Sequence, residues 1–233
     1  MSEAQRNECR LERLVMPQPA DIAISLCDET GNMLRDWADA GIECYCVDVQ
    51  HSIRRERTEG KMHFVWGDAR TWRPPEGRRI LFVSAFPPCT HVAVSGARDY
   101  AMKGGQMLRD TLEIFEACRQ AAAWSGAPWM LENPVGVLSG VPHIGKPQHY
   151  FDPCDYAGYK GGAGDLYTKK TCVWAGNGFV MPPPRRLEPT EGSRMHMLPP
   201  SDERARLRSE TPRGFARAVF EANYLRHNFA LYT

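Results

Sequence analysis

The sequence predicts an α/β fold with a mainly parallel sheet, and two observations support this prediction. Short apolar runs of buried-strand length alternate along the chain with segments whose apolar residues recur at helical spacing. The first group consists of a strand, a turn that contains glycine, a helix and a second strand that ends on an acidic residue, which is one βαβ unit. The length of 233 residues fits a single domain.

The first βαβ unit follows a polar tail at residues 1–20. Residues 22–27 form an apolar run that predicts a buried strand. Gly41 is placed to end the helix that follows, and a second strand at 43–47 ends on Asp48. The helix is predicted from four apolar residues at helical spacing: Met33, Leu34, Trp37 and Ala38.

The rest of the domain, which we place at 21–233, continues the alternation. Further strands are predicted at 80–84, 128–131 and 171–174, and a helix at 106–124. A C-terminal helix is predicted with Thr211 as its cap and Pro212 as its first residue. Residues 175–210 are rich in proline and predict an irregular connection rather than a second domain.

The composition excludes several classes of protein. Hydrophobic residues at 42% and charged residues at 24% indicate a folded chain rather than a disordered one. The net charge of +1 shows no overall electrostatic preference for nucleic acid or membrane. No apolar run approaches the roughly 18–20 residues that cross a bilayer, and no apolar segment of a signal peptide follows the polar N-terminus. We therefore expect a cytoplasmic protein that does not contact a membrane.

The chain has eight cysteines, with no Cys-x-x-Cys pair and no histidine at the spacing of a zinc site. We expect no metal site. In a reducing compartment most of these cysteines are expected to be small residues of the core. Cys44 and Cys46 fall on the same face of a strand, which suits burial. Cys89 is the exception, because its sequence setting argues for chemistry.

Polar residues gather where the predicted strands end. In parallel sheets ligands bind outside the carboxyl ends of the strands. Here those ends carry the segments Asp28-Glu29-x-Gly31, Asp48, Pro88-Cys89 and Glu132-Asn133. An acidic residue at the position of Asp48 can accept hydrogen bonds from the ribose of a dinucleotide or of S-adenosylmethionine. A solvated loop aspartate is the alternative interpretation.

Cys89 and Glu132 form a candidate pair for covalent catalysis. Pro87 and Pro88 restrict the backbone just before the thiol and so limit its positions. A thiol acts as a nucleophile when it is a thiolate, and a carboxyl group at a neighbouring strand end can protonate a substrate ring. The alternative is a proline-rich turn with a buried cysteine, together with an Asn-Pro turn capped by glutamate.

The segments Phe86-Pro87-Pro88-Cys89 and Leu131-Glu132-Asn133-Pro134 resemble the Pro-Cys and Glu-Asn motifs of the cytosine-C5 DNA methyltransferases. The chain is more similar still to the short methyltransferase-like proteins of phages and prophages, which lack a full target-recognition domain. The resemblance extends from about residue 22 to residue 224. It implies a Rossmann-like fold of S-adenosylmethionine-dependent methyltransferases, with helices on both faces of the sheet.

The resemblance also implies roles for particular residues. Cys89 would attack C6 of cytosine, and Glu132, followed by Asn133, would engage N3 and the exocyclic amine. Lys169 or Lys170 would steady the base, and strand alternation lets only one of them face inward. The S-adenosyl-L-methionine cofactor would lie against nine residues: Asp28, Glu29, Gly31, Asp48, Gly67, Asp68, Pro87, Ser209 and Thr211. Among these, Glu29 and Gly31 would line its methionine end, Asp48 its ribose and Asp68 its adenine.

The chain departs from the larger enzymes in three places. Asp28-Glu29 stands where they have a Phe-Ala-Gly run, and Thr90 stands where glutamine is usual. The long target-recognition region between the lysines and the last helix is reduced to residues 175–210. Base-specific readout of duplex DNA would be hard to build from that segment. We therefore expect low sequence specificity, or a protein partner that supplies target recognition.

DNA binding would depend on local positive charge. Between residues 53 and 79 eight basic and four acidic side chains leave a surplus of +4, and a second basic cluster comprises Arg204, Arg206, Arg208, Arg213 and Arg217. Contacts to phosphates would then dominate DNA binding. The alternative is that both clusters are solvated loops and helix faces.

The leading hypothesis is a cytosine-C5 DNA methyltransferase. The same chemistry on RNA or on a free cytosine nucleotide is the first alternative. A non-catalytic protein that binds the cofactor or nucleic acid belongs to another class, and the presence of both Cys89 and Glu132 weighs against it. A nicotinamide dehydrogenase is more distant, because the glycine fingerprint G-x-G-x-x-G is absent.

Overall fold

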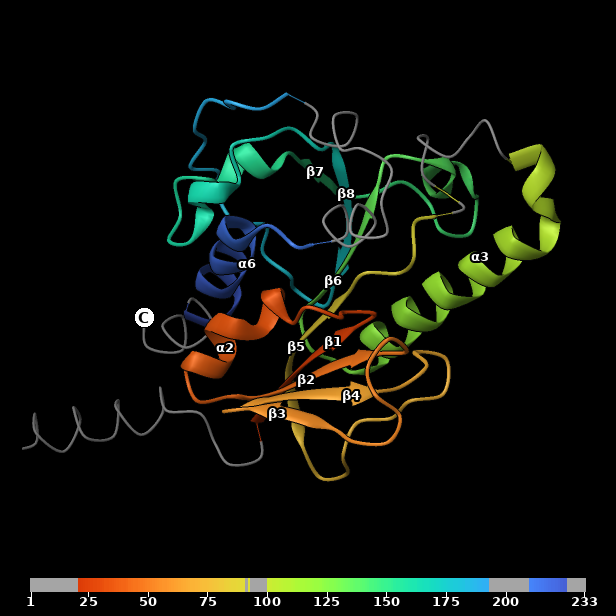
Figure 1. Ribbon diagram of the computed structural model, residues 1–233, viewed down its shortest axis with the longest axis horizontal. Helices are drawn as coiled ribbons and strands as arrows, with labels where there is room; N and C mark the ends of the chain where they lie inside the picture. Colours follow the sequence, from red (N-terminus) through yellow and green to blue (C-terminus); the bar gives the residue numbers. More distant parts are fainter. Residues whose placement is uncertain (1–20, 91, 93–99, 193–209, 226–233) are drawn as a thin grey trace, which may run out of the picture.

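A computed structural model describes residues 21–90, 92, 100–192 and 210–225 (Figure 1). Its centre is one eight-stranded sheet in the order β3-β4-β2-β1-β5-β6-β8-β7. The strands are β1 Asp21–Leu26, β2 Glu43–Asp48, β3 Arg57–Glu59, β4 Met62–Trp66, β5 Arg79–Ala85, β6 Trp129–Pro134, β7 His149–Phe151 and β8 Thr171–Gly176. The predicted α/β class is confirmed.

Five strands form the parallel core of the sheet, in the spatial order β4-β2-β1-β5-β6. Every residue of β1 is buried, as a strand covered on both faces requires. The chain builds outward in one direction from β1 and then in the other from β5, so a topological switch point lies between these two strands. The short β3 pairs antiparallel with β4, and β8 runs antiparallel between β6 and β7.

Helices cover both faces of the sheet, as predicted. On one face α2 (Arg35–Asp39) and α6 (Arg213–Phe220) pack together, with the Trp37 ring stacked on Phe82 of β5 at 4.8 Å and edge-on to Phe220 at 5.4 Å. On the other face α3 (Tyr100–Trp124) places Phe115 edge-on to Trp174 of β8 at 5.1 Å. Figure 1 shows α2 beside α6, with α3 on the far side of the strands. Two separate cores result.

Short helical turns complete the fold. They are η1 Asn32–Leu34 before α2, η3 Val137–Gly140, η4 Pro153–Tyr156 and η5 Gly162–Gly164, and η6 Glu221–Leu225 extends α6 as a π-helical turn. Within 177–192 the backbone forms neither helix nor strand, as predicted for this connection. The hydroxyl of Tyr156 donates to the carbonyl of Pro182 at 3.1 Å, which fixes the connection against η4.

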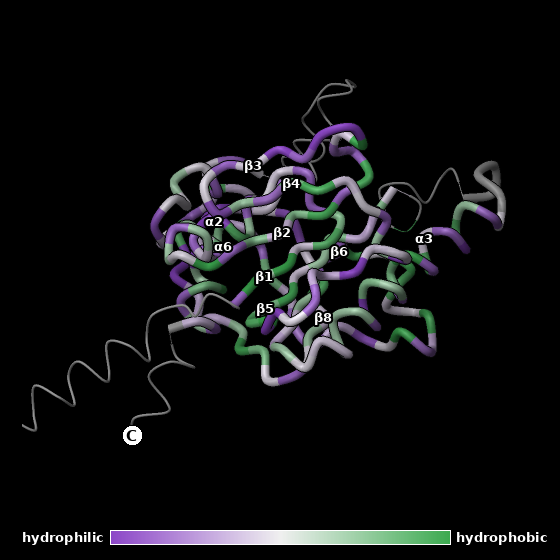
Figure 2. The backbone as a smooth tube through the Cα atoms, turned by 90° about the horizontal axis from the view of Figure 1, so that it is seen from below, coloured by the Kyte–Doolittle hydropathy of each residue, from purple (hydrophilic) through white to green (hydrophobic). Residues whose placement is uncertain are grey.

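Several elements differ from the predicted ones. Strands β3, β4 and β7 were not predicted. Strand β3 is exposed at all three residues and therefore carries no apolar pattern. Figure 2 shows it as a hydrophilic edge strand, whereas the hydrophobic β1 and β5 lie in the middle of the sheet. Helix α3 begins at Tyr100 rather than at 106. Strand β6 continues through Pro134, because its last three residues pair with β8 instead of forming a turn.

The predicted cap of the C-terminal helix is wrong. Pro212 occupies the N-cap position, the helix begins at Arg213, and Thr211 makes no capping bond. The carboxylate of Asp165, from a distant loop, accepts the backbone N–H of Gly214 at 2.7 Å. Asp165, which is remote in sequence, therefore caps the N-terminus of α6 in place of the predicted Thr211.

Candidate active site

The Pro-Pro-Cys and Glu-Asn-Pro motifs meet at the carboxyl ends of β5 and β6. These strands are parallel neighbours, and Ala85 pairs with Leu131. Phe86 follows Ala85, and Glu132 follows Leu131. Both line the same small pocket. The Asn133 amide donates to the carbonyl of Pro87 at 2.8 Å. The loop that carries the thiol is thus tied directly to the strand that carries the carboxyl group.

Two backbone hydrogen bonds hold the loop beyond Cys89. The thiol residue is half-buried and packs against the core on the α3 face. Its carbonyl accepts the N–H of Val92 at 3.1 Å, and the carbonyl of Val92 accepts the N–H of Val137 at 2.9 Å. Cys89 therefore lies between two anchored residues: Pro87, which bonds to Asn133 within β6, and Val92, which bonds to Val137 after β6.

Glu132 is a nearly buried carboxyl group. Its side chain is 14% exposed, and the Lys169 ammonium lies 3.8 Å from its Oε1. Burial raises the pKa of Glu132, and this effect outweighs the nearby Lys169 and the Thr171 hydroxyl, which lower it. A raised pKa favours the protonated carboxyl group, which can donate a hydrogen bond.

Two acceptor atoms here lack a hydrogen-bond donor among the described residues. Glu132 Oε1 and Asn133 Oδ1 are buried and have no hydrogen bond among the described residues. Buried polar atoms are nearly always paired in proteins, by the protein itself, by water or by a ligand. Two neighbouring acceptors without hydrogen bonds therefore suit a ligand that brings donor groups, such as the exocyclic amine of a base.

The structure distinguishes the two candidate lysines. Lys169 is 10% exposed and faces Glu132, whereas Lys170 is 59% exposed and lies 3.7 Å from Asp152. Both lysines precede β8, so their side chains point in opposite directions in the segment before the strand and not within it. The backbone N–H of Lys169 donates to Asp152 at 2.9 Å, which fixes the direction of the segment.

Thr211 lies at the pocket of Glu132, and it is 6% exposed. The cavity has a volume of about 10 Å³, the room of about one water molecule. A pyrimidine ring would enter only after its walls separate. Ser209, the other predicted residue of this segment, lies outside the described residues.

A second cavity of about 400 Å³ adjoins the first, because Glu210 lines both. This size is within the range of small-ligand sites. Its lining is polar and carries both signs of charge. The lining residues are Glu29, Thr30, Asn32, Arg35, Gln50, His51, Ser52, Arg55, Arg57, Phe64 and Glu210. Of the predicted cofactor residues whose positions the structure describes, Glu29 alone is in this lining.

Asp28 and Gly31 shape the turn after β1. The Asp28 carboxylate is buried and accepts the Ser25 hydroxyl at 2.7 Å, the Gly31 N–H at 2.7 Å and the Thr30 N–H at 3.1 Å. Gly31 has φ +68°, and a Cβ there would lie 2.5 Å from Met62 Cε. The hydrogen bonds of the turn explain the presence of Asp28, and its packing explains Gly31. The Glu29 side chain, by contrast, lines the large cavity.

Asp48 lies at the border of the large cavity. It is 7% exposed, and one carboxylate oxygen accepts the N–H of Gln50, a lining residue, at 2.8 Å. The Gln50 side chain also lies close enough to interact with the carboxylate. Burial raises the pKa of Asp48, and the Gln50 N–H lowers it. Gln50 therefore takes up part of the acceptor capacity of Asp48, and the carboxylate remains at the edge of the cavity.

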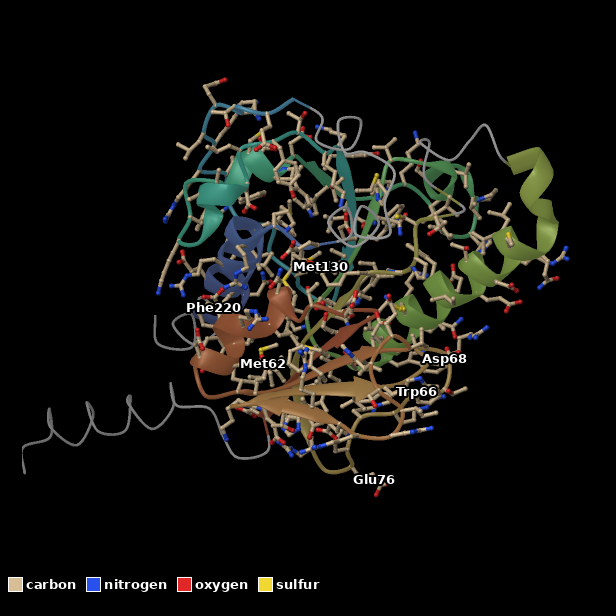
Figure 3. The ribbon with its side chains drawn as sticks, in the orientation of Figure 1. Met62, Trp66, Asp68, Glu76, Met130 and Phe220 are labelled. Carbon is tan, nitrogen blue, oxygen red and sulfur yellow. The ribbon has the colours of Figure 1, made fainter. Side chains whose placement is uncertain are left out.

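Gly67 and Asp68 are not part of either cavity lining. Arg70 pairs with the Asp68 carboxylate, with Nε 2.9 Å from Oδ1 and Nη2 2.5 Å from Oδ2, and this hydrogen bond lowers the pKa of Asp68. Figure 3 shows Asp68 beyond the end of β4, toward α3. A Cβ on Gly67 would lie 2.7 Å from Val47, so packing accounts for this glycine.

Sequence reasoning missed Asn32, Arg55 and Glu210 as site residues. Glu210 directly precedes the predicted Thr211, but what places it is a 2.9 Å hydrogen bond from the amide of Asn32, 178 residues away. The guanidinium of Arg213 also donates to the Asn32 carbonyl. Asn32 therefore joins the turn after β1 to the segment before α6.

The basic clusters are partly neutralised. Four of the eight cations between 53 and 79 form ion pairs: Arg57 with Glu59, Arg70 with Asp68, Arg78 with Glu43 and Arg79 with Asp21. In the second cluster Arg213 and Arg217 both pair with the buried Asp36. Arg204, Arg206 and Arg208 lie outside the described residues.

No protein-family model matches the chain, and no curated protein matches it. Among the residues with described positions, no group of three or more His, Cys, Asp or Glu side chains could hold a metal ion. Over the same residues, no helix is long and apolar enough to cross a membrane.

Proposed function

We propose that this chain transfers a methyl group from S-adenosylmethionine to C5 of cytosine in DNA, with Cys89 as the nucleophile on C6. The observation that carries this proposal is the hydrogen bond from Asn133 to the Pro87 carbonyl. It ties the loop of the Pro-Pro-Cys motif to the strand of the Glu-Asn-Pro motif. Glu132 lines the small pocket and Cys89 is not in its lining, so in this proposal the loop brings the thiol to the base when the pocket opens.

The topology supports the cofactor part of the proposal. The five parallel strands have the chain order 3-2-1-4-5, and helices cover both faces, as in Rossmann-like methyltransferase folds. Ligands of such sheets bind outside the carboxyl ends at the switch point. The 400 Å³ cavity, with Glu29 in its lining and Asp48 at its border, lies at those ends.

The roles of the residues follow from their surroundings. S-adenosylmethionine, when bound, supplies an electrophilic methyl group. The Cys89 thiolate attacks C6, and the protonated Glu132 donates to N3, so that C5 becomes electron-rich. Lys169 keeps positive charge beside Glu132 and the base. Asn133 does not touch the reacting atoms and acts as a positioning residue for the Cys89 loop.

DNA as substrate requires that the target cytosine leave the stack. The small cavity would then open around the extruded base, with Thr211 and Phe86 on its walls. With four cations of the first cluster paired, phosphate contacts would come from those that remain, and sequence readout would be weak. Mapping of methylated sites should show a context of one to a few bases at most.

The decisive experiment incubates the full chain with labelled S-adenosylmethionine and, in parallel, duplex DNA, single-stranded DNA, RNA and dCMP. Label on C5 of cytosine in DNA is the expected result. Label on RNA or dCMP alone would move the substrate to the first alternative, and binding without transfer would indicate the non-catalytic one.

A Cys89→Ser variant tests the nucleophile. It should lose turnover, whereas Cys154→Ser, a buried thiol on η4, should keep it. DNA that contains 5-fluorocytosine should form a covalent adduct with the wild type and with Cys154→Ser only. Full turnover in Cys89→Ser would remove the mechanism.

A further inference from the structure

The large cavity contains charges of both signs that are not neutralised to the same degree. Arg35 and Arg57 share Glu59, at 3.9 and 3.4 Å. The Arg57 guanidinium also lies 3.8 Å from the centre of the Phe64 ring. Both arginines are thus engaged within the fold.

The other charges of the lining have no such partners. Among the described residues Arg55 and Glu29 form no ion pair or side-chain hydrogen bond. Glu210 forms no ion pair there either, and only its Oε1 is engaged, by the neutral amide of Asn32. The cavity therefore presents one cation and two anions without partners of opposite charge.

This set of charges is complementary to one end of a particular ligand. The amino-acid end of S-adenosylmethionine has one carboxylate, one ammonium and one sulfonium, so it brings one anion and two cations. Arg55 and Glu210 are exposed and Glu29 is half-buried, so these charges are solvated, and a ligand group of opposite sign placed beside each of them adds a favourable Coulomb interaction. A neutral or purely anionic ligand would gain no such interaction with the two glutamates.

We infer that Glu210 recognises the sulfonium of S-adenosylmethionine, Glu29 its ammonium and Arg55 its carboxylate; this inference rests on the proposed function. Glu210 is assigned to the sulfonium because it lines both cavities, and the methyl group must reach the pocket of Glu132. Arg55 lines the large cavity only, which suits the far end of the ligand. Asn32 is the positioning residue that holds Glu210 at the junction.

The assignment couples chemistry to product release. On methyl transfer the C–S bond would break, its electron pair would stay on sulfur, and a C–C bond would form to C5 of the base. C5 would then lose its proton to solvent water, and the Cys89–C6 bond would break to release the thiolate. The sulfonium becomes a neutral thioether, so the product loses its attraction to Glu210. Glu210 thus makes the site prefer the methyl donor to its product.

Calorimetric titration of the full chain with three ligands tests the inference. The ligands are S-adenosylmethionine, S-adenosylhomocysteine, which has a neutral sulfur, and methylthioadenosine, which lacks the amino-acid end. The wild type should bind S-adenosylmethionine more tightly than S-adenosylhomocysteine. Glu210→Gln keeps the shape of the side chain and should reduce that ratio of affinities by about twofold to fivefold.

Arg55→Gln should weaken both amino-acid ligands by a similar factor and leave methylthioadenosine unchanged. Glu76→Gln, at a loop tip that projects away from the sheet in Figure 3, is the matched control and should change none of the three affinities. An unchanged ratio in Glu210→Gln, with wild-type binding intact, would overturn the inference and leave the proposed function standing. Failure of the wild type to bind any of the three ligands would instead remove the cofactor from the proposed function.

Discussion

Gly31→Ala separates a packing role from a cofactor role for the turn after β1. At φ +68° an alanine is in the left-handed region, which costs about 1–2 kcal/mol. Its Cβ would also lie 2.5 Å from Met62 Cε, 2.9 Å from Phe64 Cε1 and 3.0 Å from Cys46 Sγ. Overpacking of this kind costs about 1–3 kcal/mol. We expect a total loss of about 2–5 kcal/mol in the free energy of unfolding.

Gly60→Ala is the control for the backbone effect. Gly60 has φ +58°, and a Cβ there would meet no atom within 4 Å. It should cost only the backbone term of about 1–2 kcal/mol. Because the change in the unfolded chain is the same in both variants, the difference between them isolates the overpacking.

Urea unfolding followed by circular dichroism measures both values, provided that the slope with denaturant is unchanged. At about 2–4 °C per kcal/mol for a chain of this size, Gly31→Ala should also melt well below Gly60→Ala. Equal losses in the two variants would refute the packing argument. Gly31 would then have to be explained by a ligand rather than by Met62 and Phe64.

Three further perturbations test the site and its supports. Asn133→Leu leaves the Pro87 carbonyl without its hydrogen bond, so we expect a loss of about 1–3 kcal/mol in thermal unfolding and no adduct with 5-fluorocytosine DNA; full adduct yield would contradict the positioning role. Burial raises the pKa of Glu132 from 4.5, so the folded state holds its proton to higher pH than the unfolded state. The stability of the wild type relative to Glu132→Gln should therefore fall as pH rises from about 4.5 through the raised pKa, and a rise in thermal-melt profiles over that window would refute the assignment. Asp165→Ala removes the acceptor of the Gly214 N–H and should cost about 0.5–2 kcal/mol in thermal unfolding, whereas an unchanged melting temperature would show that α6 needs no cap from this loop.

The local sequence pattern was enough to predict the elements that are buried and regular. The run at 22–27 became β1 through Leu26, and the helical spacing that includes Trp37 became η1 and α2. The order of the two motifs along the chain was also visible, because each follows a buried strand. These features depend on backbone preference and on burial, and both leave a periodic trace in the sequence.

What decided the site was contact between distant residues. The neighbouring position of β5 and β6 placed Asn133 against Pro87, and the direction of the segment before β8 turned Lys169 inward rather than Lys170. Arg70 occupies Asp68, the predicted adenine ligand, and Asn32 brings in Glu210. Each depends on which side chains the sheet order and helix packing bring within hydrogen-bond distance, and a periodic pattern along one segment has no information about its partner. The sequence alone therefore predicted which strand ends carry polar groups, whereas the tertiary structure determined which of those groups are used by the fold and which are left to a ligand.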